Sequence, residues 1–359
     1  MKLGILTFHC AHNYGAILQC FALQQYLMSL GHDVFVIDYR PSYLLREYRK
    51  HSWRHWACSD IKLTFHKVIT EPSLWSTRNL RYDAFDGFIK TKLNLYPYQK
   101  GMDFSDFDAI FLGSDQIWEA PITGGKFDPV YFGIGARCRV ISYAASNKAK
   151  VLTESEKHWY KSTLVMFHRI GVREQNLRNL LASVIDKPVS LNVDPTLLAN
   201  NYLLEGLKEE RKIAEKYVLV YEIVEHGAVI NIAKNYARRI NAKIIILDAY
   251  ITTEERIYRD QIASPEDFVN YIRYAECVFT TSFHGTAISV LCHTDFYSFK
   301  QHNASDQRIS SLLEQLGLSQ RFVEMKALTD VDRIDYSMIS GRLSGLINES
   351  REFVKEALS

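Results

Sequence analysis

Residues 3–39 read LGILTFHCAHNYGAILQCFALQQYLMSLGHDVFVIDY, and this stretch decides the fold class. The apolar run 3–8 predicts a buried strand, and apolar positions at helical spacing between Ala16 and Leu27 predict the helix that follows it. A second apolar run, 33–39, predicts another buried strand. A strand, a helix and a second strand in this order indicate an α/β fold with a parallel sheet.

The same alternation continues along the chain and starts again after residue 190. The predicted strands are 109–112, 140–144, 170–172, 217–223, 243–247 and 277–280, and two further helices are predicted from about Val229 and over 265–275. We therefore expect two Rossmann-like domains, 1–190 and 191–330, whose parallel sheets face a cleft, where such sheets bind ligands. The tail, 331–359, has amphipathic spacing and predicts a helix that packs back on the body.

Length, composition and charge exclude several classes of protein. The chain has 359 residues, 47% of them apolar, which suffices for two domains with full cores. Its 43 basic and 41 acidic residues leave a net charge of +2, so nothing indicates nucleic-acid binding. The six cysteines lack the spacing of disulfide frameworks or zinc sites. No run fits a signal peptide or a transmembrane helix, so we expect a soluble, cytoplasmic protein without a metal.

A basic, tryptophan-rich insertion interrupts the first predicted domain at residues 40–100. Between residues 40 and 81, nine arginine and lysine residues accompany Trp53, Trp56 and Trp75, against three acidic residues. One interpretation is a surface that docks on anionic lipid or on a lipid-linked substrate, at the inner face of the membrane. The alternative is a solvated helical insertion whose tryptophans pack against the body.

Six short segments follow one another in an order that is specific as a set. They are NYGA at 13–16 with Leu18 and Gln19, LGSDQ at 112–116 with Trp118, SYAAS at 142–146, VRE at 172–174, VDPT at 193–196 and TSFHGT at 281–286. Together they resemble the polysaccharide pyruvyl transferase family over nearly the whole chain. The resemblance implies a fold similar to GT-B glycosyltransferases, phosphoenolpyruvate as co-substrate with no cofactor, and a pyruvate ketal on a sugar, free or lipid-linked, as product. It also implies bacterial capsule or exopolysaccharide biosynthesis.

Ketal formation from an enol phosphate needs a group that moves protons, and His284 is the candidate. It follows the predicted strand 277–280 at the start of a helix, where backbone amides and the helix dipole attract anions. The pKa of a histidine ordinarily lies near working pH, which suits proton transfer. With the family resemblance we predict that His284 is catalytic and that Ser282, Gly285 and Thr286 bind the donor. The alternative is a histidine with a structural hydrogen bond.

An arginine clamp is expected for the anionic donor, because the guanidinium fork matches phosphate and carboxylate. Arg173 matches the arginine of the family's Val-Arg-Glu segment and is assigned to donor binding; the alternative is an ion pair with Glu174 or Asp194. A branch of the family has an arginine where this chain has Ser282. Arg308 is a candidate replacement, with a salt bridge at a helix start as the alternative. Asp194 itself is expected to brace a turn between the halves.

The acceptor sugar is expected on the first domain. Asn13, Gly15 and Gln19 lie at the first predicted strand-to-helix turn, where they could bind sugar hydroxyls, although Asn13 also suits a helix cap. Asp115 and Gln116 follow another strand. Asp115 is a candidate base or hydroxyl acceptor, and Gln116 a candidate sugar contact; a helix cap is the alternative for the aspartate.

Two other functions compete with pyruvyl transfer. A GT-B-type glycosyltransferase would use a nucleotide sugar, but no diphosphate-binding GxGxxG motif is present. A non-catalytic glycan-binding protein would have no need of both His284 and Arg173. A zinc hydrolase is disfavoured, because His9 and His12 stand without a clear third ligand.

Overall fold

The computed structural model describes residues 1–45, 72–207, 210–223, 227–248, 259–303, 305–326 and 332–359. Residues 46–71, which hold six of the nine basic residues of the predicted docking surface, lie outside these residues. Arg40, Arg78 and Arg81 lie within them, and Arg81 is buried. The remainder of the insertion forms α2 (Ser42–Leu45), α4 (Pro72–Lys92) and β3 (Leu95–Tyr96). No helix among the described residues has the length and apolar character needed to cross a membrane.

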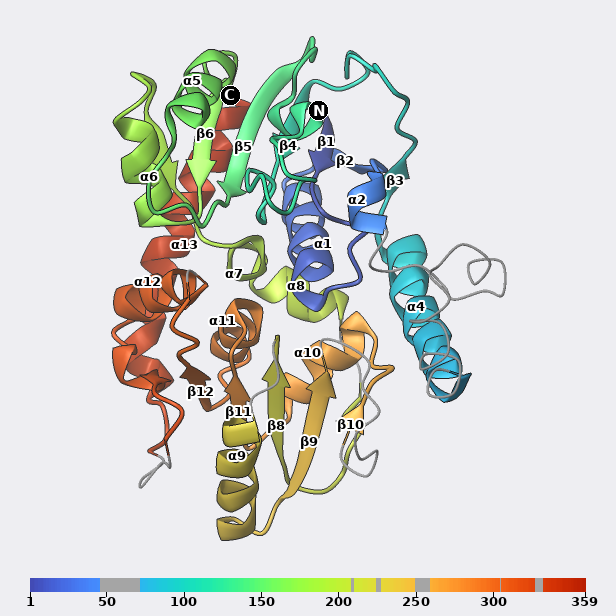
Figure 1. The fold of residues 1–359 in the computed structure, drawn as a ribbon, viewed down its shortest axis with the longest axis vertical. Coiled ribbons are helices and arrows are strands. Elements are labelled where there is room, and N and C mark those ends of the chain that lie inside the picture. Colours follow the sequence, from blue (N-terminus) through green and yellow to red (C-terminus); the bar gives the residue numbers. More distant parts are fainter. Residues whose placement is uncertain (46–71, 208–209, 224–226, 249–258, 304, 327–331) are drawn as a thin grey trace, which may run out of the picture.

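A seven-stranded sheet with the order β3-β2-β1-β4-β5-β6-β7 forms the first domain, in the upper half of Figure 1. All of its strand pairs are parallel. Besides β3, its strands are β1 (Lys2–Leu6), β2 (Asp33–Ile37), β4 (Ala109–Leu112), β5 (Arg139–Ala145), β6 (Arg169–Val172) and β7 (Val189–Leu191).

A six-stranded sheet with the order β10-β9-β8-β11-β12-β13 forms the second domain, again with parallel pairs throughout. The predicted α/β class with two parallel sheets is confirmed, and the ranges 1–190 and 191–330 each hold one sheet apart from Leu191. The strands are β8 (Tyr217–Glu222), β9 (Lys243–Asp248), β10 (Arg259–Asp260), β11 (Cys277–Thr280), β12 (Phe296–Phe299) and β13 (Phe322–Val323).

Five helices fill the space between the two sheets (Figure 1). They are α1 (Tyr14–Ser29), α7 (Pro195–Ala199), α8 (Asn201–Gly206), α10 (Pro265–Arg273) and α11 (Phe283–Leu291). The other helices are η3 (Pro129–Phe132), α5 (Glu154–Leu164), α6 (Gln175–Ala182), α9 (Gly227–Arg239), α12 (Asp306–Leu316), η5 (Ser319–Arg321) and α13 (Tyr336–Leu358).

Helix α1 is buried on nearly every side because it lies between the two domains. Its apolar residues therefore cover its whole circumference and form no single stripe. Asn13 caps it by accepting hydrogen bonds from the backbone N–H groups of the first turn. At that turn Tyr14 stacks on Phe268 of the second domain at 4.5 Å and donates its hydroxyl proton to the Ala263 carbonyl at 2.9 Å. The start of α1 is thus fixed against the second domain.

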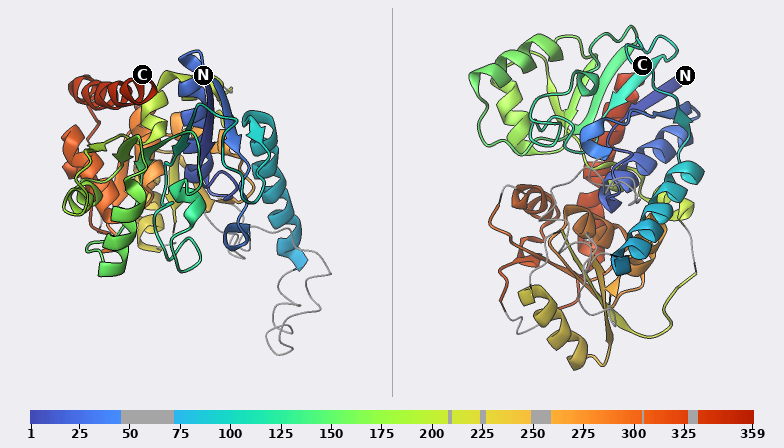
Figure 2. Two further views of the ribbon diagram at one scale, coloured as in Figure 1. Left: turned by 90° about the horizontal axis from the view of Figure 1, so that it is seen from above. Right: turned by 45° about the vertical axis from the view of Figure 1, so that its right-hand side comes forward.

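The C-terminal helix α13 runs beside both domains (Figures 1 and 2). Near its end, Phe353 packs on Tyr143 of the first sheet with ring centroids 6.2 Å apart. The hydroxyl of Ser350 accepts a hydrogen bond from the Val193 N–H at 2.9 Å, in the segment that joins the two sheets. The tail thus returns from the second domain to the first.

Candidate active site

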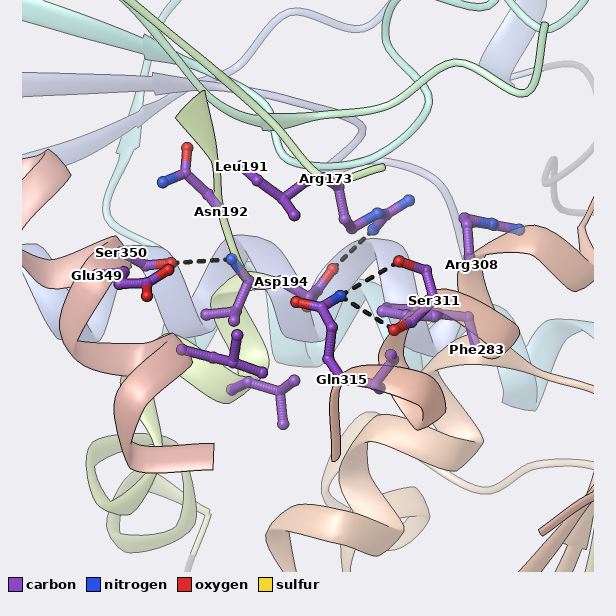
Figure 3. A pocket seen from close by; sticks show the side chains of 14 residues that line it. Arg173, Leu191, Asn192, Asp194, Phe283, Arg308, Ser311, Gln315, Glu349 and Ser350 are labelled. Atoms are coloured by element: carbon purple, nitrogen blue, oxygen red, sulfur yellow. Dashed lines mark hydrogen bonds and ion pairs between the residues drawn. The ribbon is translucent and has the colours of Figure 1, made fainter. Parts of the chain in front are cut away.

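A cleft of about 450 Å³ lies between the domains, where the first turn of α1 faces the first turn of α11. Apolar side chains of the first domain, among them Phe8, Tyr43 and Ile122, line one part, and polar or charged side chains line the rest. A second cavity of about 40 Å³ shares Phe283 and Arg308 with the cleft (Figure 3). A cavity of that size holds only a few water molecules, so the cleft is the candidate site.

His284 borders the cleft at the start of α11, as the sequence predicts. Its Nε2 lies 3.4 Å from Asp194 Oδ2, within ion-pair distance. The two groups are not aligned as a hydrogen bond, and Nε2 has no hydrogen-bond partner within the described part of the chain. The opposite edge of the ring lies against Gly15, where an added Cβ atom would fall 2.0 Å from Nδ1. Gly15 is therefore required by this close approach between the two domains.

Asp194 is buried beside His284 and lines the small cavity, and both of its oxygens have partners (Figure 3). Oδ1 caps α7 by accepting from the Thr196 N–H and hydroxyl at 3.0 and 2.8 Å, so Asp194 does brace a turn. Oδ2 accepts from Arg173 Nη1 at 2.7 Å and also faces His284. Burial alone would raise the pKa of Asp194, but His284, then Arg173 and the Thr196 N–H, hold it well below its ordinary value. The ion pair with Arg173 was an expected alternative, whereas sequence reasoning missed the contact with His284.

Arg173 is surrounded by carboxylates. Its nearest acidic oxygens belong to Asp194 at 2.7 Å, Glu174 at 3.3 Å and Asp115 at 3.8 Å (Figure 3 shows the first pair). Burial alone would lower the pKa of Arg173, but Glu174, Asp194 and Asp115 outweigh it and raise the value. The ion pairs expected under the alternative interpretation are thus present. Donor binding by Arg173 stays a prediction.

Two cations in the cleft are poorly neutralised. The guanidinium of Arg308, in the first turn of α12, makes no ion pair or hydrogen bond to the residues that the structure describes. Lys148, which sequence reasoning missed, reaches only to 4.0 Å from Glu119. Burial, then the charge of Arg173, lowers the pKa of Arg308, and burial, then the charge of Arg308, lowers that of Lys148. An anion would relieve both, because it stabilises the charged forms.

The ring of Phe283 lies against the guanidinium groups of two arginines, Arg173 and Arg308. The guanidinium of Arg173 lies 5.0 Å from its ring centroid and that of Arg308 lies 5.9 Å from it (Figure 3). Such contacts with an aromatic face stabilise a cation and keep the planar group in place. The unpaired guanidinium of Arg308 is therefore held at the cleft by packing.

Three acceptor-side candidates also border the cleft. Asn13 Oδ1 accepts from the N–H groups of Gly15 and Ala16 at 2.9 and 3.3 Å, which confirms the capping interpretation. Asp115 has a backbone φ of +76°, in the left-handed region that is uncommon outside glycine and recurs at functional sites. Gln116 donates its amide to Glu119. The structure thus brings these three residues to the same cleft as His284.

Gln19 is not at the cleft, which corrects its predicted contact with the acceptor. Its side chain is fully buried, and Nε2 donates to Thr7 Oγ1 at 2.9 Å and to the Ala16 carbonyl at 2.8 Å. Oε1 accepts from the Ser114 N–H at 3.2 Å. The amide therefore links α1 to the ends of β1 and β4 instead of facing a ligand.

Gly285 and Thr286 are corrected in the same way. A Cβ atom on Gly285 would fall 2.5 Å from Thr280 Oγ1, so the glycine lets α11 pack closely on β11. The hydroxyl of Thr286 is buried and donates to the Ser282 carbonyl at 3.0 Å. Ser282 itself caps α11 by accepting from the Gly285 N–H at 3.3 Å, and it does border the cleft.

Comparison with known proteins gives one match to a family. The family model for polysaccharide pyruvyl transferase matches residues 13–303. No curated protein matches the sequence.

In the residues described, no group of three or more side chains could hold a metal ion.

The solved structures that are similar to this chain resemble it only weakly in fold. The UDP-GlcNAc 2-epimerase from Methanocaldococcus jannaschii is 10% identical, with 97% of this chain and 93% of that chain covered and a TM-score of 0.47. The UDP-GlcNAc 2-epimerase from Neisseria meningitidis bound to UDP-GlcNAc is 9% identical, with 99% and 94% covered and a TM-score of 0.46. An O-GlcNAc transferase mutant from Thermobaculum terrenum is 10% identical, with 99% and 64% covered and a TM-score of 0.38. These similarities carry no conclusion about substrate or reaction.

Proposed function

The chain belongs to the polysaccharide pyruvyl transferase family, and from this premise we propose that it transfers the pyruvyl group of phosphoenolpyruvate to a sugar. The acceptor is a sugar of a polysaccharide or of its lipid-linked precursor. The products are a cyclic pyruvate ketal and inorganic phosphate. The setting that we propose is cytoplasmic assembly of a bacterial capsule or exopolysaccharide, at the inner face of the membrane where the precursor is lipid-linked.

The reaction makes three demands on a site. The methylene carbon of the donor gains a proton, and a sugar hydroxyl bonds to the adjacent carbon while losing its own proton. Phosphate then leaves with the electron pair of the C–O bond, and a second hydroxyl of the same sugar closes the ring. A site for this reaction has to hold a multiply charged anion, move protons and bind two hydroxyls.

The observation that carries the proposal is the unpaired guanidinium of Arg308 in the same cleft as His284 and Lys148. A buried or half-buried cation without a counter-ion is costly, so such a pair of cations favours an anionic ligand. Arg308 and Lys148 suit the phosphate and carboxylate of the donor, and His284, which borders the same cleft, would move a proton. Since three carboxylates surround Arg173, most of its charge is already compensated.

The other wall of the cleft suits the acceptor. Asp115 would accept a hydrogen bond or a proton from a sugar hydroxyl, and Asn13 and Gln116, which line the same cleft, would contact the sugar. The volume of the cleft leaves space for a sugar beyond a donor of ten heavy atoms, which supports two substrates bound together.

Calorimetric titration with phosphoenolpyruvate tests the proposal without knowledge of the acceptor. We expect saturable binding that Arg308→Ala or Lys148→Ala weakens by tenfold or more, about 1.4 kcal/mol each, because each removes a charged contact. Lys150→Ala is the matched control, since Lys150 is exposed two residues away. Inorganic phosphate is expected to compete.

The same titration separates the rival functions. Binding of a nucleotide sugar without binding of phosphoenolpyruvate would replace the proposal by a GT-B-type glycosyltransferase. Binding of glycan fragments alone would favour a non-catalytic glycan-binding protein. Phosphoenolpyruvate binding that is indifferent to Arg308 and Lys148 would leave the reaction in place but move the donor site elsewhere.

A further inference from the structure

The two nitrogen atoms of the His284 imidazole have different surroundings. Nε2 is enclosed and faces the carboxylate of Asp194 at 3.4 Å. Nδ1 lies on the edge of the ring that approaches Gly15, in the other domain. In a neutral imidazole one nitrogen carries the proton and the other accepts a hydrogen bond. The surroundings of the two nitrogens therefore determine which tautomer forms.

Asp194 is held in a fixed orientation and can therefore determine the tautomer of His284. Its Oδ1 is occupied by the Thr196 N–H and hydroxyl, and its Oδ2 accepts from Arg173 at 2.7 Å, so the carboxylate has no freedom to turn away. The low pKa of Asp194 keeps it ionised, and an ionised carboxylate only accepts hydrogen bonds. The pair is not aligned as a hydrogen bond, but at 3.4 Å the negative charge favours hydrogen on the imidazole nitrogen that faces it.

Gly15 lies against the other nitrogen of the imidazole. A Cβ atom at this position would fall 2.0 Å from Nδ1 and 2.6 Å from Cε1, closer than any real contact. The cap by Asn13 and the anchoring of Tyr14 to the second domain hold this turn of α1 in place. Only a glycine fits beside Nδ1 at such a short approach, and the His284 side chain borders the cleft.

We propose that Asp194 is a positioning residue that keeps the proton of His284 on Nε2, and that His284 exchanges a proton with substrate through Nδ1. The tautomer is independent of the proposed function, whereas the role of Nδ1 rests on it. In the transfer step the C2=C3 double bond of the donor opens: C3 takes up a proton from solvent, and a sugar hydroxyl oxygen bonds to C2 while its own proton passes to Nδ1. The imidazole then becomes a cation whose Nε2–H faces the Asp194 carboxylate, which stabilises the charge.

Nitrogen NMR tests the tautomer directly. In a long-range proton–nitrogen correlation spectrum of histidine-labelled protein, His284 is identified among twelve histidines by the signal that is lost in His284→Gln. We expect the pattern of an Nε2–H tautomer in the wild type. Asp194→Asn keeps a side-chain oxygen for the α7 cap, and we expect it to lose that pattern. An Nδ1–H pattern in the wild type, or an unchanged pattern in Asp194→Asn, would overturn the proposal; if the variant does not fold, the wild-type spectrum decides.

Two further measurements test the role of Nδ1. Gly15→Ala places a methyl group against that edge and is expected to change the His284 signals, whereas Gly87→Ala, which meets nothing within 4 Å, is expected to leave them unchanged. Addition of phosphoenolpyruvate is expected to shift the Nδ1 resonance more than Nε2. Unchanged signals in Gly15→Ala, or a shift confined to Nε2, would contradict the assignment. If calorimetry shows no binding of phosphoenolpyruvate, the proposed function is contradicted. The tautomer assignment is unaffected, because NMR measures it in the ligand-free protein.

Discussion

Gly15 and Gly285 lie in the first turns of the two helices that meet at the cleft, and each makes room for a different side chain. Gly15 makes room for the imidazole of His284, a side chain of the other domain. Gly285 makes room for Thr280, on the strand that precedes its own helix. In the sequence both follow a strand and precede a helix, so the pattern suggests a ligand-facing backbone for both. Only the three-dimensional neighbours separate an interdomain contact from a packing contact.

Gly285→Ala tests the packing role. The added methyl group would lie 2.5 Å from Thr280 Oγ1, and relieving that contact is expected to lower the free energy of unfolding by about 1–3 kcal/mol. Gly345→Ala on α13 meets open space and is expected to stabilise the protein by about 0.5–1 kcal/mol, as alanine does in helices. Urea unfolding measures both. A Gly285→Ala protein of normal stability that fails to bind phosphoenolpyruvate would restore the ligand-facing interpretation.

The residues of the site were predictable to different degrees. His284 and Asp115 border the cleft as expected, because each follows a strand whose carboxyl end meets that edge. Lys148 was missed, because it lies in a loop without a helix or strand to give it a position. The contact of Asp194 with His284 was also missed, since the two residues are 90 positions apart in sequence. Spacing along the chain carries no signal for such contacts.

Strands were predictable where they are long and apolar. The predicted strands 109–112 and 277–280 coincide with β4 and β11, at the centres of their sheets. The strands β3, β7, β10 and β13 were missed because they are edge strands of two or three residues, too short for a periodic signal. The inner strand β12 was missed as well, because its four residues include Ser298 and form no continuous apolar run. The central strands thus sufficed to predict the architecture, whereas the edge strands were identified only from the structure.

The C-terminal helix α13 is expected to stabilise the first domain although it follows the second in sequence. Phe353→Ala would remove a buried ring that packs on Tyr143 and lower the free energy of unfolding by about 3–5 kcal/mol. Met338→Ala, on the same helix but 75% exposed, is expected to change it by less than about 0.5 kcal/mol. Chemical unfolding compares the two variants. Equal, small effects would show that α13 contributes little to the packing of the first domain.

At the scale of the molecule, one hydrophobic cluster spans both domains, in addition to a cluster within each domain. A single cluster of buried apolar side chains includes Tyr14 and Phe85 of the first domain and Tyr221 and Phe268 of the second. Tyr14 is at its centre, with ring centroids 4.5 Å from Phe268, 5.0 Å from Phe85 and 5.7 Å from Tyr221. Because the core is continuous, we expect the domains to unfold together and the cleft to keep its geometry without ligand.

Tyr14→Ala is expected to break that continuity. It removes a fully buried ring and the hydrogen bond to Ala263, a loss of about 3–5 kcal/mol by analogy with other large aromatic residues. Because the lost contacts join the domains, differential scanning calorimetry should show one transition in the wild type and two in the variant. Tyr160→Ala is the matched control, since Tyr160 is equally buried but packs on Trp118 and Phe132 within the first domain. It should lower the transition temperature and keep a single transition. If Tyr14→Ala also unfolds in one transition, other contacts couple the domains; if the wild type shows two, the shared core does not couple them, and the approach of Gly15 to His284 would then depend on ligand to hold the cleft closed.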